Sequence, residues 1–549
     1  MIQKTKSIVA IFLVLVAVFL FFRLVDIDRT LSQDEILPKT AFVNLEVPGK
    51  YLGDFGQPPL WQLPNAILAS ILGTANWVFH IVPVMASIAA TILILSYLMK
   101  KFGVEYAMFS LLLLAFFPWQ INTSNQVLQT SLLTLFIISS LLFAERFHET
   151  RKRSDLRAAA AFSALALLTM FIGVVAPIAI SAYILFSAGI SRECRLRDVL
   201  YFNGITALLF AAVMAAVYFI YPLALTSSLS HAQELGGFFK IPVLGFPSLL
   251  ILFLWSGPIA LFFLAVLLTR TKSRDYTTDI HLLFLLSSLF VFLAFNSDQC
   301  RPFDRYFMVA IPSMIILMIN YGRDIFASLL TERKLLLMGF TAAFGGFLLL
   351  GTVDHPIVPL EPKLEFVKTF LASSGHVMVP YSSNGGPVGF YVPGFILLAG
   401  WAICAALFIR SIFSRNKKFP LLLISIVLAF NLCISLYQAG LMDLPNPNEA
   451  TSHLIENISG VPLGEEIFVY RNQGIIGYLP PGRNASVFQT AEFGDVTKNA
   501  SNFSVVVVDF PKISNSSAIW SELESCERVY YSNEFGIEES IYTCRNHLH

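Results

Sequence analysis

Long apolar runs separated by short charged segments dominate the first 440 residues of the chain. Each run is close to the roughly 20 residues that an α-helix needs to cross a bilayer. The pattern predicts about thirteen transmembrane helices in a polytopic α-helical membrane protein. They are expected near residues 7–22, 78–99, 105–118, 126–144, 157–171, 173–190, 199–221, 246–269, 281–295, 306–321, 335–351, 389–409 and 419–439.

Lysine and arginine gather in alternate loops between these runs. The basic loops follow Leu98, Ala144, Ile190, Thr269, Tyr321 and Ile409, and all fall on the same side as the N-terminal "QKTKS". Because basic loops stay in the cytoplasm, we expect a cytoplasmic N-terminus, an outer first loop at 23–77 and an outer C-terminus. The first run lacks a following small-residue cleavage site, so we interpret it as a retained signal anchor in an integral protein of the cell membrane.

The apolar stretch from Pro58 to Gly73 is long enough to be counted as a further transmembrane helix. Its prolines remove backbone donors at the start. Counting it as a span would also place every later basic loop on the outer face. We therefore expect a helix that lies in the outer membrane interface, within the long first loop.

Residues 441–549 have the composition of a soluble domain. "EEIFVY", "ASVFQ" and "FSVVVVDF" predict short buried strands, "AIWSELESC" a helix, and "ERVYYSNEFGIEESIYTC" two further strands. The pattern predicts a small extracytoplasmic α/β domain after a transmembrane domain over residues 1–440.

The C-terminal domain also carries features expected of a domain that has been translocated into an oxidising compartment. Cys526 and Cys544 fall at the open ends of one predicted hairpin, within reach of a disulfide. N-glycosylation is predicted at five N-x-S sequons, although composition alone also produces such triplets. Their asparagines are Asn457, Asn484, Asn499, Asn502 and Asn515.

Composition narrows the function classes further. The chain of 549 residues is 56% hydrophobic and 13% charged, with a formal net charge of +1. Nothing in this balance indicates nucleic-acid binding, since the charges follow membrane topology instead. The six cysteines form no C-x-x-C pair, so we predict no metal cluster or thioredoxin-like site.

Adjacent carboxylates, Asp34 and Glu35, lie just after the first predicted span. Such a pair can bind a divalent cation, act as a general base toward a hydroxyl, or simply be solvated. The length of the loop that carries them favours a functional role, because long ordered loops are often functional.

The order of several short motifs resembles a known family. "RLVDIDRTLSQDE", "VPGKYLGDFG" and "QPPLWQLPNAILASILG" are similar to the first outer loop of GT-C membrane glycosyltransferases. The similarity is strongest to the branch of protein O-mannosyltransferases and the lipid A aminoarabinose transferase. "FFPWQINTSNQVLQTSLLTLFIISSLLF" and "FNSDQCRPFDRYFMVAIPSMIILM" resemble later elements of that branch, and the resemblance covers residues 1–440 in architecture.

The resemblance implies that one sugar moves from a polyprenyl phosphate, such as dolichyl-phosphate mannose, to an acceptor hydroxyl on the outer face, with inversion. Asp34 matches the first acidic position of the family motif and is the expected general base, with Glu35 as its orienting partner. Arg305, with Arg301 nearby, is expected to stabilise the charge of the leaving phosphate. The acceptor is expected to be a protein, a glycan or a lipid-linked glycan.

The chain also departs from the family pattern. Gln57 stands where the family often has a lysine or histidine before Pro-Pro, so one phosphate cation is missing. Arg29, Lys39 and Lys50 are the candidate substitutes, and the sequence does not choose among them; Lys50 is included with the expected donor-phosphate residues. Asp54, Tyr306 and Trp61 are predicted to contact substrate, although an aromatic belt explains the last two equally well. No cofactor or resident metal is predicted; a divalent cation between the carboxylates and the phosphate is compatible with the chemistry.

Three alternatives follow from the same features. A transporter or flippase for lipid-linked sugars is the main one, but such proteins place ionisable residues in mid-span, whereas these spans are nearly free of charge. An oligosaccharyltransferase is disfavoured because the C-terminal domain is small and has no "WWD" motif. A membrane-tethered binding domain would not need so many spans.

Overall fold

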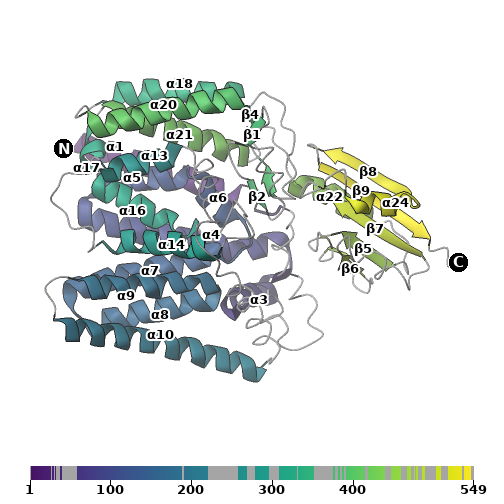
Figure 1. Cartoon of the computed structure of the whole chain (residues 1–549), viewed down its shortest axis with the longest axis horizontal. Coiled ribbons are helices and arrows are strands. Elements are labelled where there is room, and N and C mark those ends of the chain that lie inside the picture. The colour runs from purple at the N-terminus through teal and green to yellow at the C-terminus, as the bar shows by residue number, and fades with distance from the viewer. Residues whose placement is uncertain are drawn as a thin grey trace.

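The structure is a computed structural model of the whole chain, shown in Figure 1. The residues that it describes are 2–25, 27–29, 31, 38–39, 42, 58–187, 191–220, 258–268, 279–295, 308–329, 332–350, 375–377, 381–383, 386–388, 391–414, 418–438, 447–458, 466–470, 475, 478–479, 485–488, 502–508, 513, 517–534 and 537–545.

Helices make up most of the described chain, and each predicted span contains one. They are α1 (Ile2–Leu24), η3 (Pro59–Trp61), α3 (Gln62–Leu72), α4 (Asn76–Phe102), α5 (Val104–Ala115), α6 (Pro118–Asn125), α7 (Thr130–Thr150), α8 (Arg153–Thr169), η4 (Phe171–Val174), α9 (Val175–Phe186), α10 (Arg192–Ile220), α13 (Pro258–Leu268), α14 (Ile280–Phe295), α16 (Ile311–Tyr321), α17 (Arg323–Leu329), α18 (Arg333–Leu350), α20 (Gly394–Phe413) and α21 (Lys418–Gln438).

Four helices in the described ranges are long and apolar enough to cross a membrane by themselves: α4, α7, α10 and α21. Shorter apolar helices occupy the other predicted spans. The total of about thirteen therefore stays a prediction. The stretch after Pro58 forms η3 and then α3, whose 11 residues extend only about 16 Å. That length is too short for a span.

The helices run roughly parallel, with α18, α20 and α21 along one side of the body and α8, α9 and α10 along the other (Figure 1). One continuous apolar core joins them, from α1 through α4, α5 and α7 to α16 and α21. The α10 helix lies at the edge and exposes large apolar side chains such as Leu200, Leu208 and Phe219. Exposed apolar helix surface of this kind suits contact with lipid.

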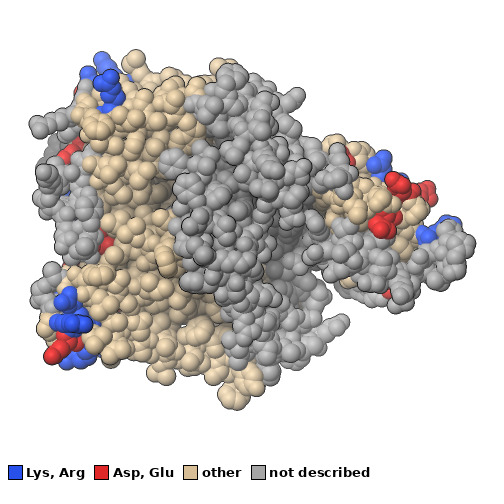
Figure 2. Space-filling view, in the orientation of Figure 1, with Lys and Arg blue, Asp and Glu red and all other residues tan. Residues whose placement is uncertain are grey.

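Charge separates the two ends of the helical body. In Figure 2 lysine and arginine of the helical body gather at the end where the N-terminus lies, and the described surface beside them shows almost no charged side chains. Basic residues of this end include Lys100 and Lys101 at the end of α4, Arg153 at the start of α8 and Arg192 at the start of α10. We call it the basic end. The domain at the opposite end follows α21 in the sequence.

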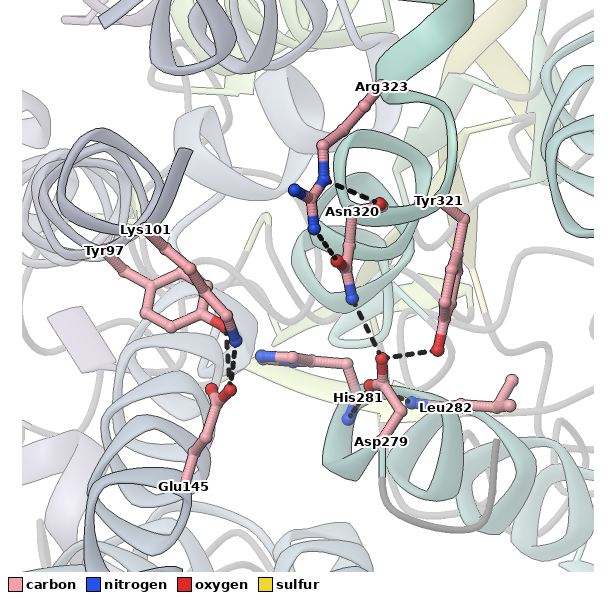
Figure 3. Close-up of polar contacts among 9 residues, drawn as sticks. All are labelled: Tyr97, Lys101, Glu145, Asp279, His281, Leu282, Asn320, Tyr321 and Arg323. Carbon is pink, nitrogen blue, oxygen red and sulfur yellow. Dashed lines mark hydrogen bonds and ion pairs between the residues drawn. The ribbon is translucent and has the colours of Figure 1, made fainter. Parts of the chain in front are cut away.

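Polar contacts fix the helix termini at the basic end (Figure 3). Tyr97 and Lys101 of α4 both donate hydrogen bonds to Glu145 of α7, the tyrosine at 3.0 Å. Asp279 accepts hydrogen bonds from the backbone N–H groups of His281 at 3.0 Å and Leu282 at 3.3 Å. It therefore caps α14, whose first N–H groups have no partner within the helix.

The same aspartate also binds α16. The Tyr321 hydroxyl donates to Oδ2 of Asp279 at 2.6 Å, and the Asn320 amide does so at 3.2 Å. The ends of α4, α7 and α16 thus meet the start of α14 at the basic end (Figure 3). Because α4 and α7 are long enough to cross the body, their starts lie at the other end, toward the C-terminal domain.

Two small antiparallel pairs between α18 and α20 were not predicted from the sequence. The strand β1 (Gly375–Val377) pairs with β4 (Tyr391–Pro393), and β2 (Tyr381–Ser383) pairs with β3 (Gly386–Val388). Strands of three residues give no usable alternation of polar and apolar positions.

The C-terminal domain is a five-stranded sheet with helices on both faces. Its strand order is β6 (Ala485–Phe488), β5 (Glu466–Tyr470), β7 (Asn502–Val508), β9 (Ile537–Arg545) and β8 (Glu527–Glu534). The first three are parallel, and β9 and β8 continue antiparallel. The boundary predicted at 440/441 lies outside the described residues.

Alternate residues of β7 face two separate cores, as its continuous apolar sequence requires. Val506 and Val508 pack with Leu454 of α22 (Pro447–Ile458) on one face. Val505 and Val507 pack on the other face with α24 (Ala518–Leu523). The structure joins Cys526 to Cys544 by a disulfide. Three cysteines are free in the described residues: Cys194, Cys404 and Cys433.

Candidate functional site

The first loop leaves α1 from a buried anchor. Arg23 is only 1% exposed, and its guanidinium lies 3.6 Å from the Phe19 ring centroid. It donates hydrogen bonds to the carbonyls of Phe19 at 3.1 Å and Leu114 at 2.9 Å. Backbone carbonyls of α1 and α5 therefore bind a charge that would otherwise be costly to bury. This contact fixes the end of α1 against α5.

The next residues attach the loop to α4 and α6. The Asp28 carboxylate accepts a hydrogen bond from the Trp77 N–H at 3.2 Å, in the first turn of α4. Arg29 donates to the carbonyl of Asn125 at 3.0 Å, and the Asn125 amide donates to the carbonyl of Phe22 at 2.9 Å. A carboxylate at a helix N-terminus is favourable because it meets unpaired N–H groups and the positive end of the helix dipole.

We call these contacts of the first loop with α4, α5 and α6 the framework. A residue of the C-terminal domain adds to it. The Tyr478 hydroxyl accepts a hydrogen bond from the Leu31 N–H at 2.5 Å. The ammonium of Lys39 lies 4.7 Å from the centroid of the Tyr478 ring and donates to Oδ1 of Asn76 at 2.9 Å. Residues 31, 39, 76 and 478 are therefore brought together where the loop meets the start of α4.

An apolar cluster supports the framework. Leu31, Trp61, Val78, Phe79 and Val127 are buried in it. Tyr478 packs against the same cluster. The cluster thus combines the first loop, the helix after Pro58, the starts of α4 and α7, and the C-terminal domain.

The electrostatics of the framework centre on Lys39, which is half-buried. Burial lowers the pKa of Lys39, and the Asp28 carboxylate partly offsets that shift. Lys39 and Arg29 thus both bind protein groups within the framework.

The predicted catalytic and phosphate-binding residues lie outside the described residues. This holds for Asp34, Glu35, Lys50, Asp54, Gln57, Arg301, Arg305 and Tyr306. The structure describes their neighbours in the sequence. Leu31 and Lys39 flank the carboxylates, Pro58 follows Gln57 and begins η3, and buried Met308 follows Arg305 before α16.

Trp61 requires a correction. We expected its ring to contact substrate or to belong to an aromatic belt. Its exposed fraction is 1%, and it packs inside the apolar cluster beside Leu31 and Phe79. Trp61 is therefore a core residue, since a ring with no accessible face cannot stack on a sugar.

Two of the five sequon asparagines are described. Asn457 is exposed in α22, where its amide donates to the carbonyl of His453 at 2.8 Å, and Asn502 is exposed at the start of β7. Asn484, Asn499 and Asn515 lie outside the described residues. N-glycosylation of the five remains a prediction.

Sequence reasoning did not identify the roles of Tyr478, Asp28 and Asn125. Tyr478 precedes a Pro-Pro pair and resembles any loop aromatic, and its partners are more than 400 positions away. Asp28 lies two residues after Asp26, and no local pattern links it to Trp77. Among the described residues, no group of three or more His, Cys, Asp or Glu side chains is placed to hold a metal ion.

Comparison with known proteins confirms the resemblance noted in the sequence. Residues 56–231 match the dolichyl-phosphate-mannose-protein mannosyltransferase family. No curated protein matches the chain significantly.

The fold is similar to that of solved membrane glycosyltransferases. ArnT from Cupriavidus metallidurans bound to undecaprenyl phosphate superposes with a TM-score of 0.59 and 13% identity, over 97% of both chains. The apo state of the same protein gives a TM-score of 0.59 and 12% identity, over 98% of both chains. The oligosaccharyltransferase AglB from Archaeoglobus fulgidus gives 0.45 and 11% identity over 91% of this chain and 69% of its own, too little to support an argument.

Proposed function

We propose that this chain is a GT-C membrane glycosyltransferase that moves one monosaccharide from a polyprenyl phosphate to an acceptor hydroxyl on the outer membrane face. The observation that carries the proposal is the likeness to ArnT, which covers 97% of both chains and so includes the C-terminal domain. That relative was solved with undecaprenyl phosphate, which supports a lipid phosphate as the carrier. The match to the mannosyltransferase family supports a mannose donor.

The reaction is a single displacement. The acceptor oxygen attacks the anomeric carbon as the bond from that carbon to the phosphate oxygen breaks, which inverts the configuration. Asp34 removes the acceptor proton, and Glu35 orients the base or the acceptor. The products are the glycosylated acceptor and the free polyprenyl phosphate. The acceptor is a protein, a glycan or a lipid-linked glycan.

The leaving phosphate gains negative charge, so cations must stabilise it. Arg305 and Arg301 are the proposed donors, and Gln57 adds a neutral hydrogen bond. Arg29 and Lys39 already bind Asn125 and Asn76. We therefore favour Lys50 as the remaining cation, and Asp54 and Tyr306 as further substrate contacts. A divalent cation that bridges the carboxylates and the phosphate is compatible with this arrangement.

Orientation follows from charge. The basic end carries the N-terminus and the C-terminal domain lies opposite, which supports a cytoplasmic N-terminus and an extracytoplasmic domain in the cell membrane (Figure 2).

The test uses purified full-length protein in lipid nanodiscs. A panel of radiolabelled polyprenyl-phosphate monosaccharides, including dolichyl-phosphate mannose, is supplied with membrane extract as a source of acceptor. We expect label to move from at least one donor into an acceptor. The same donors are then tested in sealed liposomes. Movement of intact donor across the bilayer, with no transfer of label, would replace this proposal with the flippase alternative.

A further inference from the structure

One tyrosine of the C-terminal domain contacts both sides of the carboxylate-bearing segment of the first loop. The Tyr478 hydroxyl binds the Leu31 N–H at 2.5 Å, and its ring lies 4.7 Å from the Lys39 ammonium. Leu31 and Lys39 flank Asp34 and Glu35 in the sequence. The two contacts therefore tether this segment before and after its carboxylates.

Tyr478 is firmly attached to its own domain. Ile475, three residues before it, is fully buried in the core that includes Leu454 and Val506. Leu479, the next residue, packs against the same core. The position of Tyr478 is thus set by the sheet and α22.

The first-loop side of the contact is also held by packing and hydrogen bonds. Leu31 is fully buried beside Trp61 and Phe79. A buried backbone N–H must have a partner, and the Tyr478 hydroxyl provides one for Leu31. Lys39 is held by Asn76 at the start of α4. The contact therefore joins two packed cores.

We propose that Tyr478 is a positioning residue for sugar transfer, which acts by fixing the segment that carries Asp34. This inference rests on the proposed function. A general base must lie within hydrogen-bond reach of the proton that it removes. Displacement by about 1 Å can slow a reaction by about 100-fold. The C-terminal domain then completes the active site through its contact with the first loop.

The test compares Tyr478→Phe with Tyr531→Phe in the full-length protein. Tyr478→Phe removes the hydroxyl that binds Leu31 and keeps the ring beside Lys39. Tyr531 is an exposed tyrosine of β8 in the same domain, so its variant is a matched control. Transfer is measured with the donor that the wild type uses, and the affinity for undecaprenyl phosphate is measured separately.

We expect Tyr478→Phe to lower the transfer rate at saturating donor by roughly tenfold. The affinity for undecaprenyl phosphate should stay within about twofold of the wild type, because a residue that positions the base acts on the transfer step and not on carrier binding. Hydrogen exchange at the Leu31 amide should speed up roughly fivefold, since the amide loses its acceptor. Tyr531→Phe should behave as the wild type in all three measurements.

The outcomes separate this inference from the proposed function. A wild type that transfers no sugar from any donor overturns both. If the wild type is active and Asp34→Asn is not, but Tyr478→Phe transfers and exchanges like the wild type, only the positioning role is wrong. It is also wrong if the affinity for undecaprenyl phosphate falls as much as the transfer rate.

Discussion

The ammonium of Lys39 lies 4.7 Å from the centre of the Tyr478 ring, although the two residues belong to the first loop and to the C-terminal domain. The arrangement allows a cation–π attraction, which strengthens when the cation loses part of its hydration. Half-burial of Lys39 also penalises its charged form, which lowers the pKa of Lys39.

Lys39 should therefore make stability depend on pH in the alkaline range. The folded protein releases the Lys39 proton at lower pH than the unfolded chain, whose lysine pKa is about 10.4. Between these values the unfolded chain binds more protons, so the contribution to stability rises with pH. The unfolding temperature of the wild type should rise relative to that of Lys39→Met as the pH is raised toward the unfolded lysine pKa.

Thermal unfolding in nanodiscs across this range checks the prediction. Lys152→Met, at an exposed position of the basic end, is the control. A pH dependence identical in wild type and Lys39→Met would contradict the burial of the charge.

Asp279 should stabilise the helical body without affecting transfer. Asp279→Ala removes the cap of α14 and the acceptor of Tyr321, which should cost about 2–3 kcal/mol in unfolding free energy. Tyr321→Phe should cost about 1 kcal/mol. The double variant should lose less than the sum, since the hydroxyl has already lost its acceptor.

Chemical denaturation measures these effects, and the transfer rate per folded molecule should be unchanged. The reason is that Asp279 lies near the end of α4 (Figure 3), whereas the first loop contacts the start of α4 through Asp28 and Lys39. A loss of transfer with unchanged stability would show that the basic end takes part in the reaction.

Trp61 should behave as a core residue. Trp61→Ala should lower the free energy of unfolding by about 3–5 kcal/mol, as expected for a large buried ring. Trp61→Phe should cost less and leave the KM for donor unchanged, because the ring has no face toward substrate. Donor titration of Trp61→Phe tests this. A large rise in KM at unchanged unfolding temperature would restore a direct role in sugar binding.

The sequence predicted elements whose signals are local. The apolar run at 78–99 lies within α4, and residues 503–508 of the run "FSVVVVDF" belong to the strand β7, which is buried on both faces. Pro58 and Pro59 correctly marked the start of a separate helix. Such signals depend on the periodicity and backbone chemistry of nearby residues.

The site framework could not be predicted in the same way. Leu31 and Tyr478 are 447 positions apart, and nothing in either segment encodes the partner. The burial of Arg23 is similar: a charge at the end of a span is usually a solvated anchor, whereas here carbonyls of two helices bind it. Tertiary packing alone decides these contacts.

The most direct test of the account is the transfer rate of Asp34→Asn. The asparagine keeps the size of the side chain but cannot accept the acceptor proton, so transfer should fall by at least about 100-fold. Binding of undecaprenyl phosphate should stay close to that of the wild type. Asp324→Asn, at an exposed position of the basic end, should transfer at the wild-type rate. Transfer by Asp34→Asn at the wild-type rate would contradict the account.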